Sequence, residues 1–244
     1  MGVVGAARID LSGLRAVDVP ALEGRLDAAT LVCFPTDTVY GVGGALTTSV
    51  AAALVAGKGR PAGKPLQVVF GSLARLEAAV TMAPAVHAAC RRLLPGPVTL
   101  VVPHPEGWDF PPPGAVDDPA DAAPVATLGV RVPAWPEAAR CLAALARPLV
   151  ASSANRSGAP APAALDEVDA ELLARCDLVL DGGRVSGTAS SVVDLSRYAA
   201  TGSWRLLRRG AWDEETVAAR LRDACDRATP AARPRGGGGE DPRS

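Results

Sequence analysis

The sequence predicts an α/β protein built on a twisted, mixed sheet with flanking helices. Short apolar runs typical of strands alternate with helical segments, and these runs extend from about residue 31 to residue 207. The chain has 244 residues, of which 48% are hydrophobic and 21% charged, a composition typical of a packed globular protein. A chain of this length can form one large domain or two small ones, and we favour one.

The elements follow one another with little interruption. Runs rich in valine and leucine predict strands at residues 30–34, 65–70, 98–102, 127–132, 148–155, 177–181, 191–195 and 204–208. We expect roughly seven strands in the sheet. Helices are expected at residues 47–57, 72–80, 84–94 and 136–146 and from Asp213, whose side chain is suited to capping. Residues 104–124 are rich in proline and acidic residues and predict a surface excursion. Periodicity leaves the strand order open.

The end of the chain differs in composition from the rest. Residues 228–244 show no apolar periodicity and contain four consecutive glycines, so we expect a flexible tail after a folded domain of residues 1–227. No run reaches the roughly 18 apolar residues that a membrane span needs, and the first residues lack the pattern of a secretory signal. The expected location is therefore the cytoplasm.

Cysteine, histidine and charge exclude several classes of protein. The five cysteines are far apart and form no CxxC pair, which fits reduced thiols better than disulfides, and only two histidines are present. We therefore expect no protein metal site. The formal net charge of -1 gives no overall positive field for nucleic acid, so any anion must bind locally.

Lysine and side-chain amides are scarce, and their positions are informative. Basic residues are almost all arginine, and the two lysines, Lys58 and Lys64, both lie in the segment KGRPAGK. Asn155 is the only asparagine and Gln67 the only glutamine. Loop chemistry alone explains such placement in part, since lysine and asparagine are common in turns. Arginine has replaced lysine almost everywhere in this chain, and the two side chains differ as ligands. The two lysines that remain therefore indicate a site.

The segment KGRPAGK carries three cations within seven residues, Lys58, Arg60 and Lys64, separated by glycine and proline. Arginine binds phosphate oxygens in a bidentate manner and lysine acts as a point charge, so this loop is suited to an anion. A solvated basic turn is the alternative. The string GxxxxGK[ST] does not occur, which argues against a P-loop.

The segment SSANRSG places Ser153 and Asn155 at the end of an apolar strand, where α/β proteins commonly bind ligands. A nucleophilic serine is the alternative reading. The segment lacks a GxSxG elbow, and neither His87 nor His104 has a catalytic context, so a serine hydrolase is disfavoured.

Four further positions are weaker candidates. The segment PTDTVYGVGG, which includes Thr38, predicts either a small polar pocket or a capped turn. Arg131 lies in an apolar run and needs an anionic partner, which is either a ligand carboxylate or an internal Asp or Glu. Ser190 and Arg208, on late strands or at their ends, are able to complete a phosphate site.

Together these motifs resemble the YrdC/Sua5 threonylcarbamoyl-AMP synthases. The segments that carry the resemblance occur in family order over residues 31–211: FPTDTVYGVG, KGRPAGKPL, LLPGPVTLVV, GVRVPAWP, SSANRSGAPAP, DGG, SSVVDL and LLRRGA. The family's KxR and SxN elements match residues 58–60 and 153–155. The chain ends soon after the family domain, so it is similar to the short, single-domain form.

The resemblance implies a YrdC-like fold with a large concave, positively charged cleft. It implies an enzyme that joins L-threonine, bicarbonate and ATP, with Mg²⁺, into threonylcarbamoyl-AMP and pyrophosphate. This product feeds the t6A modification of tRNA through a downstream transferase complex. By residue match, the catalytic tetrad is Lys58, Arg60, Ser153 and Asn155. Threonine would contact Thr38, Arg131, Ser153 and Ser190, and nucleotide would contact Lys58, Arg60, Thr127, Asn155 and Arg208.

The chain departs from the family pattern at three positions, Lys64, Val69 and Ala163, where many relatives have other residues. These departures leave the substrate contacts open. Two other functions are therefore considered: a related carbamoyl-adenylate-forming enzyme, and a nonenzymatic module that binds double-stranded RNA in the basic cleft. The net charge of -1 weakens the second.

Overall fold

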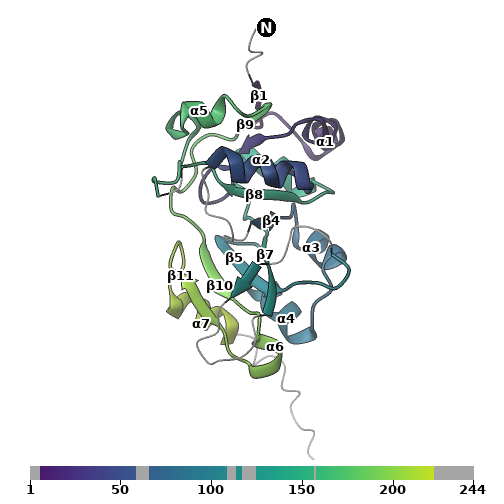
Figure 1. Ribbon diagram of the computed structural model, residues 1–244, viewed down its shortest axis with the longest axis vertical. Coiled ribbons are helices and arrows are strands. Elements are labelled where there is room, and N and C mark those ends of the chain that lie inside the picture. Colours follow the sequence, from purple (N-terminus) through teal and green to yellow (C-terminus); the bar gives the residue numbers. More distant parts are fainter. Residues whose placement is uncertain (1–5, 59–65, 109–113, 117–124, 157, 223–244) are drawn as a thin grey trace, which may run out of the picture.

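A computed structural model describes residues 6–58, 66–108, 114–116, 125–156 and 158–222, in which a mixed sheet is flanked by helices (Figure 1). The strands are β1 (Ala7–Asp10), β2 (Val32–Phe34), β3 (Gly41–Ala45), β4 (Gln67–Val69), β5 (Val98–Pro103), β6 (Gly114–Val116), β7 (Val125–Arg131), β8 (Leu149–Ser153), β9 (Leu178–Asp181), β10 (Ser191–Asp194) and β11 (Arg205–Arg208). The α-helices are α1 (Val19–Ala28), α2 (Thr48–Lys58), α3 (Leu73–Ala79), α4 (Pro84–Leu93), α5 (Ala170–Leu173), α6 (Tyr198–Thr201) and α7 (Glu214–Arg222). The 3-10 helices are η1 (Ala16–Asp18), η2 (Glu137–Ala144) and η3 (Leu165–Glu167).

All the described strands join one sheet. Ten lie on a single path in the order β1-β9-β2-β3-β8-β4-β7-β5-β10-β11, and β6 pairs with β7 as an eleventh strand. The pairs β1–β9, β2–β9, β4–β7 and β5–β10 are parallel and the others antiparallel, so the sheet is mixed, as predicted. In Figure 1, β1, β9, α1, α2 and α5 gather at one end of the molecule, and β5, β10, β11, α4, α6 and α7 at the other.

The sheet has three strands that the sequence pattern did not predict, β1, β3 and β6. The clearest case is β3, whose sequence GVGGA is poor in strand-forming residues. At Gly43 the reason is the close approach of β8, because a Cβ atom there would lie 2.0 Å from the carbonyl oxygen of Val150. A glycine-rich segment can thus be a central strand when a neighbouring backbone excludes side chains.

Other predicted elements agree with the structure in kind, with shifted ends. The helix expected from residue 136 is the 3-10 helix η2, and the last helix begins as expected, with Asp213 Oδ1 accepting the backbone N–H of Thr216 at 3.0 Å. The expected surface excursion contains β6, while residues 109–113 and 117–124 lie outside the described part of the chain. So does the predicted tail of residues 228–244, and the boundary at residue 227 stays a prediction.

The two faces of the sheet are covered differently. On one face, the alternate strand residues Val150, Val68, Val130, Leu100 and Val193 lie in core clusters with α2 and α5 or with α3, α4 and α7. On the other face, α1 and η2 cover only part of the sheet, where their side chains pack around Phe34, Val69 and Leu149. The remainder of this second face is hollow, and it holds the candidate site.

Candidate functional site

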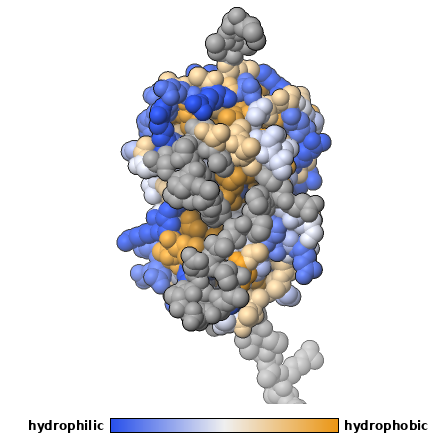
Figure 2. Space-filling model, in the orientation of Figure 1, coloured by the Kyte–Doolittle hydropathy of each residue, from blue (hydrophilic) through white to orange (hydrophobic). Residues whose placement is uncertain are grey.

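A cavity of about 710 Å³ occupies the uncovered part of the second sheet face. Eight consecutive strands of the sheet path, from β2 to β11, each contribute at least one lining residue, and the edge strands β1 and β9 contribute none. These residues are Phe34, Gly41, Ala151, Gln67, Gly129, Val101, Val192 and Leu207 in sheet order. In Figure 2, hydrophobic residues are exposed near the middle of the molecule and hydrophilic residues lie along both of its sides. The sequence prediction had placed the ligand beyond a strand end, whereas the cavity extends across the face of the sheet.

Small residues create this hollow. Side chains on a strand alternate between faces, and the residues that point to this face near its centre include Gly41, Gly129 and Ala151. Larger side chains at these positions would fill the space above the sheet. The depth of the cavity is therefore encoded in the strands themselves.

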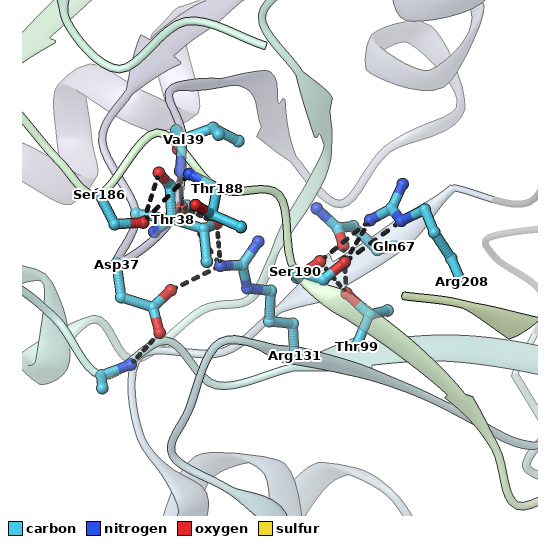
Figure 3. Close-up of polar contacts among 12 residues, drawn as sticks. Asp37, Thr38, Val39, Gln67, Thr99, Arg131, Ser186, Thr188, Ser190 and Arg208 are labelled. Atoms are coloured by element: carbon cyan, nitrogen blue, oxygen red, sulfur yellow. Dashed lines mark hydrogen bonds and ion pairs between the residues drawn. The ribbon is translucent and has the colours of Figure 1, made fainter. Parts of the chain in front are cut away.

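Arg131, at the end of β7, is the largest buried polar side chain at the cavity and is only 2% exposed. Its Nη2 atom donates to Asp37 Oδ1 and to Thr38 Oγ1, each at 2.5 Å (Figure 3). Asp37 is held in turn, because its Oδ2 accepts the backbone N–H of Ala134 at 3.0 Å. Of the two partners considered for this arginine, the internal carboxylate is present.

Burial lowers the pKa of Arg131, and the nearby Asp37 carboxylate opposes this effect. The guanidinium remains protonated, as arginine does in proteins. Its Nε atom is buried without a hydrogen-bond partner among the described residues. The side chain therefore has donor capacity beyond its contacts with Asp37 and Thr38.

The segment before β3 forms a capped turn. Thr36 Oγ1 accepts the backbone N–H of Thr38 at 3.2 Å and of Val39 at 3.3 Å, and it donates to the carbonyl of Val39 at 2.7 Å. Thr38 is fully buried and its hydroxyl is used by Arg131, so it is not among the residues that line the cavity. The turn is capped, as one reading predicted, and Thr36 and Val39 of the same segment also line the cavity.

A second polar group is formed by residues of β4, β5 and β11 and by Ser190, which immediately precedes β10. Arg208 donates to the carbonyl of Ser190 through Nε at 3.2 Å and Nη2 at 2.8 Å, and Nη2 also lies 3.2 Å from Ser190 Oγ. Ser190 Oγ is 3.1 Å from Thr99 Oγ1, which donates to Gln67 Oε1 at 2.9 Å (Figure 3). Burial lowers the pKa of Arg208. No described carboxylate pairs with it.

Ser153 and Asn155 lie at the end of β8 and immediately after it, and both line the cavity. Ser153 Oγ donates to Asn155 Oδ1 at 2.5 Å, and Asn155 Nδ2 donates to the carbonyl of Ala159 at 2.5 Å. The amide of the chain's only asparagine thus ties the loop to the strand and fixes the serine hydroxyl beside the cavity.

Five of the predicted site residues therefore line one cavity: Arg131, Ser153, Asn155, Ser190 and Arg208. Thr127 is on the same face of β7 as Gly129 and Arg131 but is not among the residues that line the cavity. Arg60 and Lys64 lie outside the described residues, as does the side chain of Lys58, the last residue of α2.

Two lining residues, Gln67 and Thr99, were missed as site residues. For Gln67, the signal was its status as the only glutamine, and for Thr99 the sequence offers none.

The described residues contain no group of three or more His, Cys, Asp or Glu side chains placed to hold a metal ion. In the same part of the chain, none of the helices combines the length and apolar character that a bilayer span requires.

Comparison with known proteins gives the family. The family model Sua5/YciO/YrdC, described as telomere recombination, matches residues 25–210. A threonylcarbamoyl-AMP synthase of Pyrococcus abyssi is 34% identical over 178 residues, covering 72% of this chain and 50% of that protein. A putative threonylcarbamoyl-AMP synthase of Mycobacterium tuberculosis is 34% identical over 209 residues, covering 84% of this chain and 89% of that protein. The chain thus spans half of the archaeal relative and most of the mycobacterial one.

Solved structures agree. P. abyssi Sua5 complexed with L-threonine matches with a TM-score of 0.67 and 28% identity, over 89% of this chain and 60% of that one. E. coli YciO, at 18% identity, shares the fold with a TM-score of 0.65 over 86% of this chain and 96% of that one. The matched region contains the sheet-face cavity with both of its arginine groups, and the chain belongs to the Sua5/YciO/YrdC family.

Proposed function

We propose that this protein is a threonylcarbamoyl-AMP synthase, a nucleotidyltransferase that makes threonylcarbamoyl-AMP and pyrophosphate from L-threonine, bicarbonate and ATP. The observation that carries the proposal is that one cavity, in a chain of this family, is lined by both Arg131 and Arg208, and that Arg208 has no carboxylate partner among the described residues. Such a cavity offers one cationic position for a carboxylate and another for phosphate. Relatives that bear this name match most of the chain.

The reaction needs few protein groups to change bonds. The amino nitrogen of threonine forms a bond to the carbon of bicarbonate and water leaves, which gives a carbamate. A carbamate oxygen then attacks the α-phosphorus of ATP, and the bond to pyrophosphate breaks. Such a displacement depends on alignment and on neutralised phosphate charge more than on a protein nucleophile.

We assign the two arginine groups to the two substrates. Arg131, oriented by Asp37 and Thr38, receives the carboxylate of threonine, with Ser190 and Ser153 beside it. Arg208 receives phosphate, since no described carboxylate neutralises it and its pKa, although lowered by burial, leaves it cationic.

The nucleotide side of the site is assigned to the residues that match the family elements. Asn155, which holds the Ser153 hydroxyl, would lie where threonine and ATP meet. Lys58, Arg60 and Thr127 complete the nucleotide contacts in this proposal, and Lys58 and Arg60 act on the phosphates.

The charge of the cavity fits an ATP complex. Its described lining residues include no carboxylate and three arginines: Arg131 pairs with Asp37 and Arg156 with Asp169 and Glu171, whereas Arg208 pairs with no described carboxylate. With the lysines of the 58–64 segment added, we propose a basic cleft. Because no described carboxylate lines the cavity, Mg²⁺ would be held by the ATP phosphates and water. The ion would neutralise developing phosphate charge.

The experiment is a pyrophosphate-release assay with ATP, L-threonine and bicarbonate, with each omitted in turn. We expect release only when all three are present. Release that needs neither threonine nor bicarbonate would contradict the proposal. A parallel reaction with carbamoyl phosphate in place of threonine and bicarbonate identifies a related carbamoyl-adenylate-forming enzyme. Salt-dependent binding of double-stranded RNA without turnover identifies the RNA-binding alternative.

The proposed product is an activated intermediate, because its acyl phosphate bond transfers the threonylcarbamoyl group readily. We place the enzyme in the cytoplasm, before a transferase complex that modifies tRNA to t6A.

A further inference from the structure

Gln67 is the only glutamine of the chain and lies near the centre of the cavity floor. It is the first residue of β4, where it pairs with Ala151 of β8 on one side and Gly129 of β7 on the other. Strand propensity does not favour glutamine at this half-buried position over a β-branched residue. The amide therefore needs an explanation from its surroundings.

The orientation of this amide is fixed by a directional chain of hydrogen bonds. Arg208 donates to Ser190 Oγ, whose distance to Thr99 Oγ1 is 3.1 Å, and Thr99 donates to Gln67 Oε1 at 2.9 Å. Since Oε1 is the acceptor, the NH₂ group points away from Thr99, as Figure 3 shows. Nε2 donates to no described residue, so two N–H donors are presented to the cavity.

Space is available in front of these donors. The register partner of Gln67 is Gly129, where a Cβ atom would meet the Leu66 carbonyl oxygen at 3.4 Å and Gln67 Cβ at 3.7 Å, which are ordinary contacts. The fold therefore does not require glycine here, and its effect is to leave the cavity open beside the amide. Arg131 lies two residues further along β7 on the same face, so its Cα is about 8 Å from that of Gln67.

The two side chains suit different oxygen atoms of one small ligand. A guanidinium prefers a carboxylate, as in its contact with Asp37, whereas a neutral amide binds a neutral oxygen without the cost of desolvating another charge. A spacing of about 8 Å between the Cα atoms leaves room for an amino acid whose carboxylate faces Arg131 and whose side chain faces Gln67.

We propose that Gln67 is a specificity-determining residue, whose amide N–H groups bind the side-chain hydroxyl of the amino-acid substrate. The inference rests on the proposed function, because it assigns a selectivity to the amino-acid part of that site. A donor that is satisfied only by a hydroxyl-bearing ligand discriminates against the isosteric ligand that lacks the hydroxyl. For threonine that isostere is valine.

The test compares L-threonine with L-valine in the wild type and in Gln67→Leu, which keeps the size of the side chain and removes its donors. Titration calorimetry gives both affinities, and the pyrophosphate assay gives kcat/KM for threonine. We expect the affinity and kcat/KM for threonine to fall about tenfold, with valine affinity not reduced and KM for ATP unchanged. An unchanged preference for threonine over valine would overturn the proposal.

A second variant keeps the test valid if Gln67→Leu folds poorly. Thr99→Val removes the hydroxyl that orients the amide, and we expect threonine affinity to fall about threefold with valine affinity unchanged. Equal loss for both amino acids in either variant, with a lower Tm, would show a structural role and overturn the proposal. Wild-type protein that releases pyrophosphate but does not prefer threonine to valine would contradict the Gln67 assignment alone. Wild-type protein without any threonine-dependent turnover would contradict the proposed function as well.

Discussion

Arg131 and Arg208 line the same cavity, but the protein treats their charges in opposite ways. Arg131 is 2% exposed and forms an ion pair with Asp37, with an N–O distance of 2.5 Å. Arg208 is solvent-exposed where it lines the cavity on β11, and its described hydrogen bonds go to the carbonyl and hydroxyl of Ser190. Burial lowers the pKa of both. One charge is therefore neutralised within the fold and the other is not.

The difference distinguishes an arginine whose charge is neutralised within the fold from one whose charge is left for a ligand. A buried ion pair stabilises little relative to an apolar core, yet removal of one partner leaves an uncompensated charge. An exposed arginine held by a carbonyl keeps its charge for an anion that arrives from outside. Variants of Arg131 should therefore affect folding as well as threonine use, whereas variants of Arg208 should affect substrate use with little effect on folding.

The largest expected effect follows from Arg131→Met, which leaves the Asp37 carboxylate buried without its partner. We expect the free energy of unfolding to fall by about 3–5 kcal/mol, measured by urea denaturation. Arg131→Met combined with Asp37→Asn removes both charges and should restore part of the loss. A loss below about 1 kcal/mol in the single variant would show that the pair is not the structural element described.

Arg208→Ala tests the other half of the comparison. We expect kcat/KM for ATP to fall about a hundredfold, because a cation aimed at developing phosphate charge is removed, while unfolding changes by less than about 1 kcal/mol. The control is Arg209→Ala, at the adjacent arginine. The side chain of Arg209 is 78% exposed, and its Nη2 atom lies 3.9 Å from Asp213 Oδ2. Equal loss of activity in both variants would indicate a general effect of surface charge.

The sequence predicted the class of fold and most of its strands, because those strands are apolar runs between polar turns. It missed β3, since the glycines that let β8 approach there look like loop residues. It also left the strand order open, because β4 lies between β8 and β7, which are far from it along the chain. Such pairing depends on packing that no local pattern records.

For the site, several motifs in family order predicted a common set of residues that no single motif would have predicted alone. Arg131 was expected to need an anion, but periodicity does not identify Asp37 as the partner across 94 positions. The position of the cavity on the sheet face follows from small residues such as Gly129, whose role depends on which strands lie beside it. A scarce residue type, Gln67, was noticed, but its hydrogen-bond partner Thr99 was not predictable from the sequence.

The smallest expected effect comes from Ser190→Ala, which separates the two functions of that residue. Its carbonyl holds Arg208 through two hydrogen bonds that alanine retains, so the phosphate position should persist. Only the hydroxyl between Arg208 and Thr99 is lost, and we expect kcat/KM for threonine to fall about fivefold with KM for ATP nearly unchanged. In a double-mutant cycle with Arg208→Ala, a coupling near zero for ATP would agree with this separation. A strong coupling for ATP would mean that the Ser190 hydroxyl, and not its carbonyl, positions the arginine, and the contrast between the two arginines would then extend to how each is held.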